Sequence, residues 1–223
     1  TCPSDIVVEG CDETEITNGS LTALAYSETL VTITEAQFLA ESGSAVNDEC
    51  GIDNITYIDS QSGTCPIEVT RLFTVTDPCG NTATCEQAIT IDDTTDPTIT
   101  CPSDIVVEGC DETEITNGSL TALAYSETLV TITEAQFLAE SGSAVNDECG
   151  IDNITYIDSQ SGTCPILVTR LFTVTDPCGN TATCEQAITI DDTTDPTITC
   201  PSDIVVEGCD ETEITNGSLT ALA

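Results

Sequence analysis

The sequence predicts an all-β fold of tandem immunoglobulin-like antiparallel β-sandwich domains, with one short helix per repeat and disulfides as staples. Three observations lead to this expectation. The 223 residues repeat with a period of 99, the runs between turns are rich in Thr, Val and Ile, and each full copy contains six cysteines. A period near 100 residues is too long for a helical solenoid and suits a small independent domain.

The expected boundaries are residues 1–95 for the first repeat, 96–194 for the second, and 195–223 for the start of a third, incomplete repeat. We expect this stretch to be a window in a longer array. Two full periods differ at one position, where Glu68 corresponds to Leu167. The alternating pattern places this position on the strand face opposite Phe73. A neutral difference and a contact between chains both remain open for it.

The elements are predicted from the first repeat. Residues 5–9 (DIVVE) form a short β-branched strand, and residues 11–20 form a polar turn region. Residues 21–33 form one or two strands. Thr34 caps a helix of about two turns that ends before Gly43. Residues 52–58 form the next strand.

The last element of each repeat is a β-hairpin. Residues 67–76 alternate between large apolar or Arg side chains and mostly Thr, which is the period-two pattern of a strand. The DPCGN segment forms the turn, and residues 82–91 form the returning strand.

Six cysteines per repeat allow fifteen pairings, and the assumed sandwich selects among them. Cys2 and Cys11 lie at the two ends of one extended strand, too far apart to bond. A first strand parallel to the last brings Cys2 near Cys85 and Cys11 near Cys65. Zinc is disfavoured because there is no His and no C-x-x-C segment. The expected bridges are Cys2–Cys85, Cys11–Cys65 and Cys50–Cys79, and likewise Cys101–Cys184, Cys110–Cys164 and Cys149–Cys178.

The composition is strongly acidic, with a net charge of −38, no Lys, and Arg71 and Arg170 as the only basic residues. Such a surface repels nucleic acid and anionic membranes, and no apolar run in the segment is long enough to insert into a bilayer. The cysteine content indicates an oxidising, extracellular location. Divalent cations are the natural counter-ions.

Calcium is the candidate cofactor, because hard cations prefer several oxygen ligands. A solvated acidic surface without an ion is the alternative, and no EF-hand motif occurs. A second acidic cluster comprises Asp48, Glu49 and Asp77. The candidate ligands at the repeat junctions are Asp92, Asp93, Asp96, Asp104, Glu108, Asp191, Asp192 and Asp195.

Two kinds of glycosylation site match by pattern. Thr94 and Thr193 lie in DTT segments that resemble a short bacterial O-glycosylation motif, and Asn18 and Asn54 lie in N-x-S/T sequons. Unmodified side chains are the alternative. No catalytic residue is predicted, because His and Lys are absent and the expected bridges consume the thiols.

The segment RLFTVTDPCGNTATCEQAITIDDTTDPTITCP, residues 71–102, resembles the HYR (hyalin-repeat) domain and its relatives. It is especially similar to repeats in giant secreted adhesins of gliding and other Bacteroidota. The resemblance covers about 40 residues of each repeat: the final hairpin, the junction and the first strand. It implies immunoglobulin-like modules that are strung in tandem outside the cell.

We therefore expect a structural repeat of a long secreted filament or stalk at the cell surface, connected with adhesion or gliding motility. The expected partners are the neighbouring repeats of the same chain, with surface glycans or proteins beyond them. One alternative is a carbohydrate- or protein-binding module in which each repeat is the binding unit. Lateral assembly of several chains into one fibre is another.

Overall fold

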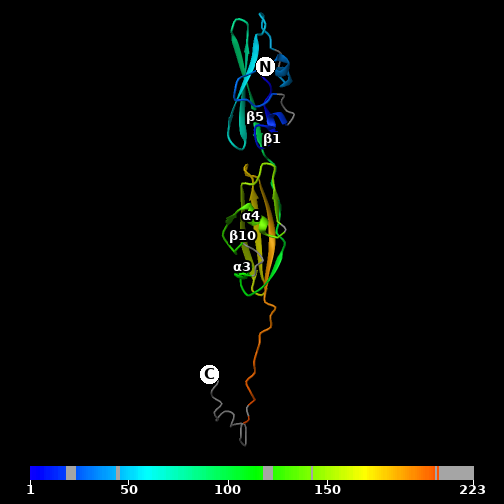
Figure 1. Cartoon of the computed structure of the whole chain (residues 1–223), viewed down its shortest axis with the longest axis vertical. Coiled ribbons are helices and arrows are strands. Elements are labelled where there is room, and N and C mark those ends of the chain that lie inside the picture. The colour runs from blue at the N-terminus through cyan, green and yellow to red at the C-terminus, as the bar shows by residue number, and fades with distance from the viewer. Residues whose placement is uncertain (19–23, 44–45, 118–122, 142, 204, 206–223) are drawn as a thin grey trace. The chain divides into compact units, whose positions relative to one another are not determined.

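The computed structural model describes residues 1–18, 24–43, 46–117, 123–141, 143–203 and 205 (Figure 1). The chain divides into two compact units, residues 1–192 and 193–223. The first unit contains both full repeats, each with its own five-stranded sheet. The described residues of the second unit form no helix and no strand. Among the described residues, no helix is long and apolar enough to cross a membrane.

In the first repeat the sheet has the order β1-β5-β4-β3-β2. Figure 1 shows β1 beside β5, and these two strands run parallel whereas the other pairs are antiparallel. The elements are β1 (Ile6–Glu9), α1 (Glu15–Asn18), β2 (Val31–Ile33), α2 (Glu35–Ala40), β3 (Asn54–Ser62), β4 (Ile67–Thr76) and β5 (Thr82–Asp92).

The second repeat repeats this sheet in the order β7-β12-β11-β10-β8 and adds a small two-stranded sheet, β6-β9. Strand β6 carries Ile99 onto the apolar core of the second repeat. The elements are β6 (Thr98–Thr100), β7 (Ile105–Glu108), α3 (Glu114–Asn117), β8 (Val130–Ile132), α4 (Glu134–Ala139), β9 (Ala144–Asn146), β10 (Asn153–Gly162), β11 (Ile166–Thr175) and β12 (Thr181–Asp191).

The predicted hairpin and the predicted parallel first strand are both present. Strands β4 and β5 pair over their whole length, with Phe73 opposite Cys85. Val69 and Phe73 are buried on one face, and Glu68 is exposed on the other, as the alternation indicates. At the equivalent position Leu167 is exposed.

The predicted helix is confirmed, but it is not the only one in its repeat. Thr34 caps α2 through a capping box, in which its hydroxyl accepts the Gln37 N–H and Gln37 Oε1 accepts the Thr34 N–H. The polar segment after β1, predicted as a turn, contains the additional four-residue helix α1. Its Ile16 is completely buried against the sheet, which explains why this polar segment folds back.

The predicted all-β fold is confirmed, and strands make up most of the regular structure in each repeat. The segment before the first helix cap contains less strand than predicted. Of residues 21–33, only Val31–Ile33 forms a strand; residues 19–23 lie outside the described part. The carbonyls of Leu24 and Ala25 accept hydrogen bonds from the Arg71 guanidinium, so these residues lie in a loop anchored to the sheet. Short helices and loops therefore cover the sheet face where a second full sheet was expected.

Arg71 organises this cover. It is fully buried in β4 and forms a two-pronged ion pair with Asp59, with Nε–Oδ1 2.8 Å and Nη2–Oδ2 2.9 Å. Its guanidinium lies 4.7 Å from the ring centre of Tyr57. Glu41, at the end of α2, lies 3.7 Å away and accepts the Leu24 N–H. The repeat's only cation thus ties loop, helix and sheet together.

The second repeat has the same arrangement around Arg170. This residue is also completely buried, pairs with Asp158 at 2.8 Å, and bonds to the carbonyls of Leu123 and Ala124. Both arginines of the chain are therefore consumed inside the two cores, and the described surface carries no Arg or Lys.

We predict that Arg71→Met destabilises the first repeat by about 3–5 kcal/mol, because it leaves the buried Asp59 and Glu41 carboxylates without their partner. Urea denaturation of the whole chain measures this change. Adding Asp59→Leu to the variant removes one of the two unpaired buried carboxylates and is expected to restore part of the stability. An unchanged unfolding midpoint in Arg71→Met would contradict the assigned role.

Candidate functional site

The junction between the two repeats brings together four cysteines. Cys11 follows β1, and Cys65 lies in the β3–β4 turn, so both lie at the end of the first repeat where β5 finishes. Cys149 precedes β10, and Cys178 lies in the β11–β12 turn, at the end of the second repeat where β12 begins.

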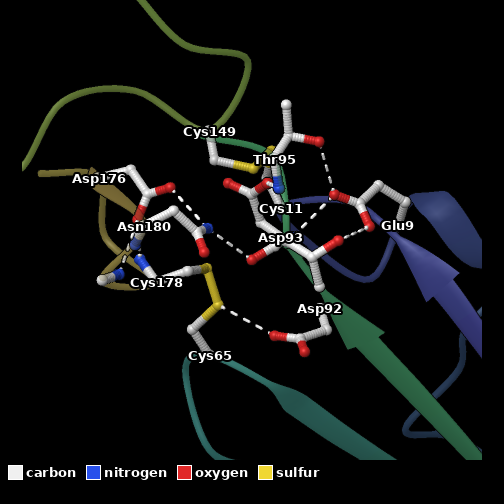
Figure 2. Close-up of a disulfide and its surroundings, with 12 residues drawn as sticks. Glu9, Cys11, Cys65, Asp92, Asp93, Thr95, Cys149, Asp176, Cys178 and Asn180 are labelled. Carbon is white, nitrogen blue, oxygen red and sulfur yellow. Dashed lines mark hydrogen bonds between the residues drawn. A yellow bond between two sulfur atoms is a disulfide. The ribbon is translucent and has the colours of Figure 1, made fainter. Parts of the chain in front are cut away.

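These four cysteines bond across the junction. Cys11 pairs with Cys149 and Cys65 with Cys178, with Cα–Cα distances of 5.2 and 5.1 Å. The loops that they close span 138 and 113 residues. Closing one loop of this size restricts the unfolded chain and so stabilises the folded state by about 5 kcal/mol. Figure 2 shows the two bridges on either side of Asp93.

Two of the six predicted bridges are confirmed, and four are wrong. Cys2–Cys85 and Cys101–Cys184 form, each with a Cα–Cα distance of 5.6 Å, because the first strand runs parallel to the last. For the other pairs, the prediction that both cysteines lie at the same end of their repeat is correct. Each of these cysteines that is bonded, however, has its partner in the adjoining repeat. The bridges that do not form are Cys11–Cys65, Cys50–Cys79, Cys110–Cys164 and Cys149–Cys178.

The unpaired cysteines follow the same rule. Cys50 and Cys79 are the first-repeat equivalents of Cys149 and Cys178, and both are exposed. Cys110 and Cys164 are the second-repeat equivalents of Cys11 and Cys65, and are exposed as well. Cys200 is also unpaired, and Cys209 lies outside the described residues. Each repeat thus carries one pair of junction cysteines at either end.

Polar contacts also cross the junction. Asn180 Nδ2 donates to the backbone carbonyl of Asp93 and to Asp176 Oδ2, at 2.8 Å each. Asp176 in turn accepts the backbone N–H groups of Cys178, Gly179 and Asn180, which fixes the DPCGN turn. Burial acts to raise the pKa of Asp176, but these hydrogen bonds outweigh it and the net shift is downward.

Glu9 holds the chain where it leaves the first repeat. Its carboxylate accepts the Thr94 N–H at 2.8 Å and the hydroxyls of Thr94 and Thr95 at 2.9 Å (Figure 2). These hydrogen bonds, that from the Thr94 backbone first, lower the pKa of Glu9. The Thr94 hydroxyl, a predicted glycosylation site, therefore donates a hydrogen bond to Glu9. Thr94 and the other predicted glycosylation site, Thr193, are both exposed.

Asp93 lies at the centre of the junction. Its side chain is only 2% exposed. One carboxylate oxygen, Oδ1, accepts the Thr95 N–H at 3.0 Å, and the other, Oδ2, is buried with no hydrogen-bond partner. Burial, followed by the negative charges of Asp147, Asp176 and Glu9, raises the pKa of Asp93.

The two acidic clusters identified in the sequence meet here, one from each repeat. Asp93 belongs to the first, and Asp147, Glu148 and Asp176 are the second-repeat equivalents of Asp48, Glu49 and Asp77. Oxygens of Glu9, Asp93 and Glu148 lie within 4.8 Å of one another. Asp147 and Asp176 belong to two further groups around Asp93.

Several predicted calcium ligands lie elsewhere. Asp104 accepts the Ala187 N–H within the second repeat, and Glu108 lies at the far end of β7. Glu9, the first-repeat equivalent of Glu108, lies at the junction but was not among the predicted ligands. The parallel pairing of β1 with β5 places Glu9 opposite Asp92, so the expected topology could have revealed it. The remaining candidates lie outside the three groups that contain Asp93. Asp92 lies 3.7 Å from Cys65 Sγ and forms a separate group with Cys65 and Cys178. Asp191 lies 3.8 Å from Cys164 Sγ, and Asp96, Asp192 and Asp195 are exposed.

The two repeats offer a comparison of one sequence in two contexts. Asp176, behind a preceding repeat, is 2% exposed, whereas its equivalent Asp77 is partly exposed. Asp93, before a following full repeat, is buried, whereas its equivalent Asp192 is exposed. The junction itself therefore causes the burial of these carboxylates.

Of the two N-glycosylation sequons of the first repeat, the one at Asn18 extends into residues outside the described part, and Asn54 begins β3 with its side chain partly exposed. No family model matches the chain, and no curated protein matches it.

Proposed function

We propose that the chain is a structural segment of a long secreted filament or stalk at the cell surface, and that this filament serves adhesion or motility. The observation that carries the proposal is the double cross-link between neighbouring repeats. Two disulfides and the peptide chain join the repeats, so the junction has three covalent connections. Four disulfides fit an oxidising environment, and the cell exterior is one such compartment.

The positions of the unpaired cysteines support continuation of the same arrangement. Cys110 and Cys164 present to a following repeat the two thiols that Cys11 and Cys65 use in the observed junction. The partners in this proposal are neighbouring repeats of the same chain. Every such junction then carries two cross-links.

Short covalent routes across each repeat suit a load-bearing role. Cys164 and Cys178 are only 14 positions apart in the sequence, and most of the residues between them are already extended in β11. A second route runs over the 16 residues from Cys85 to Cys101. Either route stretches to roughly 50–60 Å, whereas 99 unlinked residues reach roughly 330–350 Å. Tension therefore adds little length to an oxidised array.

The charge distribution supports the same role. Both arginines are buried, so neighbouring filaments present acidic surfaces that repel one another. This arrangement favours single threads over lateral bundles.

We predict that the cross-links limit motion between the repeats. A chain in which Cys11, Cys65, Cys149 and Cys178 are all changed to Ser should show a broader distribution of interdomain distances in small-angle X-ray scattering than the oxidised chain. The matched control carries Ser at the four unpaired equivalents, Cys50, Cys79, Cys110 and Cys164, and should scatter like the parent chain. Equal scattering from both variants would contradict the role of the cross-links.

A glycan array separates the stalk from a binding module. We expect the oxidised two-repeat chain to give no specific signal, because the repeats serve as spacers and the binding function lies elsewhere in the filament. Saturable binding to one class of glycan would overturn the proposal in favour of a carbohydrate-binding repeat. That binding must persist when the fluorescent label is attached at the other end of the chain, which excludes an effect of the label.

A further inference from the structure

A buried carboxylate at the junction lacks a compensating charge. Asp93 is 2% exposed, and its Oδ2 atom accepts no hydrogen bond. A buried carboxylate is strongly destabilising unless a cation, a set of donors or an added proton compensates it. The chain has no Lys, and both of its arginines are enclosed in the cores by Asp59 and Asp158. No basic side chain is therefore available to Asp93.

The neighbours of Asp93 increase the negative charge. Glu9 comes from the end of β1 in the first repeat, while Asp147 and Glu148 come from the loop before β10 in the second. Asp176 also lies near Asp93, and its Oδ1 accepts N–H groups of the DPCGN turn. Carboxylates from two repeats thus come together around the buried Asp93 side chain.

The spacing of these oxygens suits a hard divalent cation. Carboxylate oxygens of Glu9, Asp93 and Glu148 lie within 4.8 Å of one another. Two oxygens on opposite sides of a Ca²⁺ ion lie about 4.6–5.2 Å apart, from Ca–O distances of about 2.3–2.6 Å. Glu9 and Glu148 are exposed, so water has access to complete the coordination. The nearby sulfurs of Cys149 and Cys178 are in disulfides, which leaves oxygen as the only ligand type.

We propose that Glu9, Asp93 and Glu148, with Asp147 beside them, bind one Ca²⁺ ion between the two repeats. The ion neutralises Asp93 and links the first repeat to the second independently of the disulfides. This inference does not rest on the stalk proposal, since it concerns only the chemistry of the junction.

Calorimetric titration of the oxidised, EDTA-treated chain with CaCl₂ tests the site. The expected result is one saturable Ca²⁺ site and a higher melting temperature in Ca²⁺ than in EDTA. In Asp93→Asn, the affinity should fall by roughly tenfold or more, because the central charged ligand is lost. This variant should melt in EDTA no lower than the parent chain, because the neutral amide removes the repulsion from neighbouring carboxylates.

The chain supplies two matched controls. Asp192→Asn changes the equivalent residue of the second repeat, and Glu49→Gln changes the first-repeat equivalent of Glu148. Both remove one acidic charge outside the junction and should leave the Ca²⁺ affinity unchanged, whereas Glu148→Gln should weaken it. Absence of saturable binding up to millimolar Ca²⁺, or equal affinity in Asp93→Asn and Asp192→Asn, would overturn the proposal.

Discussion

The disulfides between repeats are the constraint on which the junction depends. They hold the β3–β4 turn of the first repeat against the β11–β12 turn of the second. In that position Asn180 donates a hydrogen bond to the backbone carbonyl of Asp93, and Asp93 is buried. The ends of a repeat therefore have a different environment where another repeat is joined: carboxylates of both repeats come together there, and Asp93 is buried.

Within a repeat, a buried ion pair together with hydrogen bonds connects the loops to the sheet. The only cation is buried in the central sheet, where Arg71 binds Asp59 and two loop carbonyls. The described surface is therefore left without a basic side chain, and carboxylates from both repeats lie close together at the junction. Covalent cross-links and a bound cation are two physical ways to hold such a junction closed.

Much of each repeat was predictable because the determining signals are local. Alternation along residues 67–76 and 82–91 gave the hairpin, and the parallel first strand gave Cys2–Cys85. The loop at Leu24 was not predictable, since its carbonyls bond to a distant arginine. The pairing between repeats was also missed. Cys65 lies at one end of its repeat, close both to Cys11 of the same repeat and to Cys178 of the next, so its position alone does not identify its partner. Period-two patterns contain no information about that choice.

Disulfide mapping tests the central claim most directly. The chain is unfolded without reduction, digested with proteases specific for Asp and Glu, and analysed by mass spectrometry. Glu68 distinguishes the Cys65 peptide from its Cys164 counterpart. We expect the Cys65 peptide to be linked to a peptide that contains a DPCGN segment. That segment cannot be the one in the same repeat, because the ten residues of β4 lie between it and Cys65 and span roughly 33 Å. A Cys65 peptide linked to a Cys11-type peptide would contradict the account.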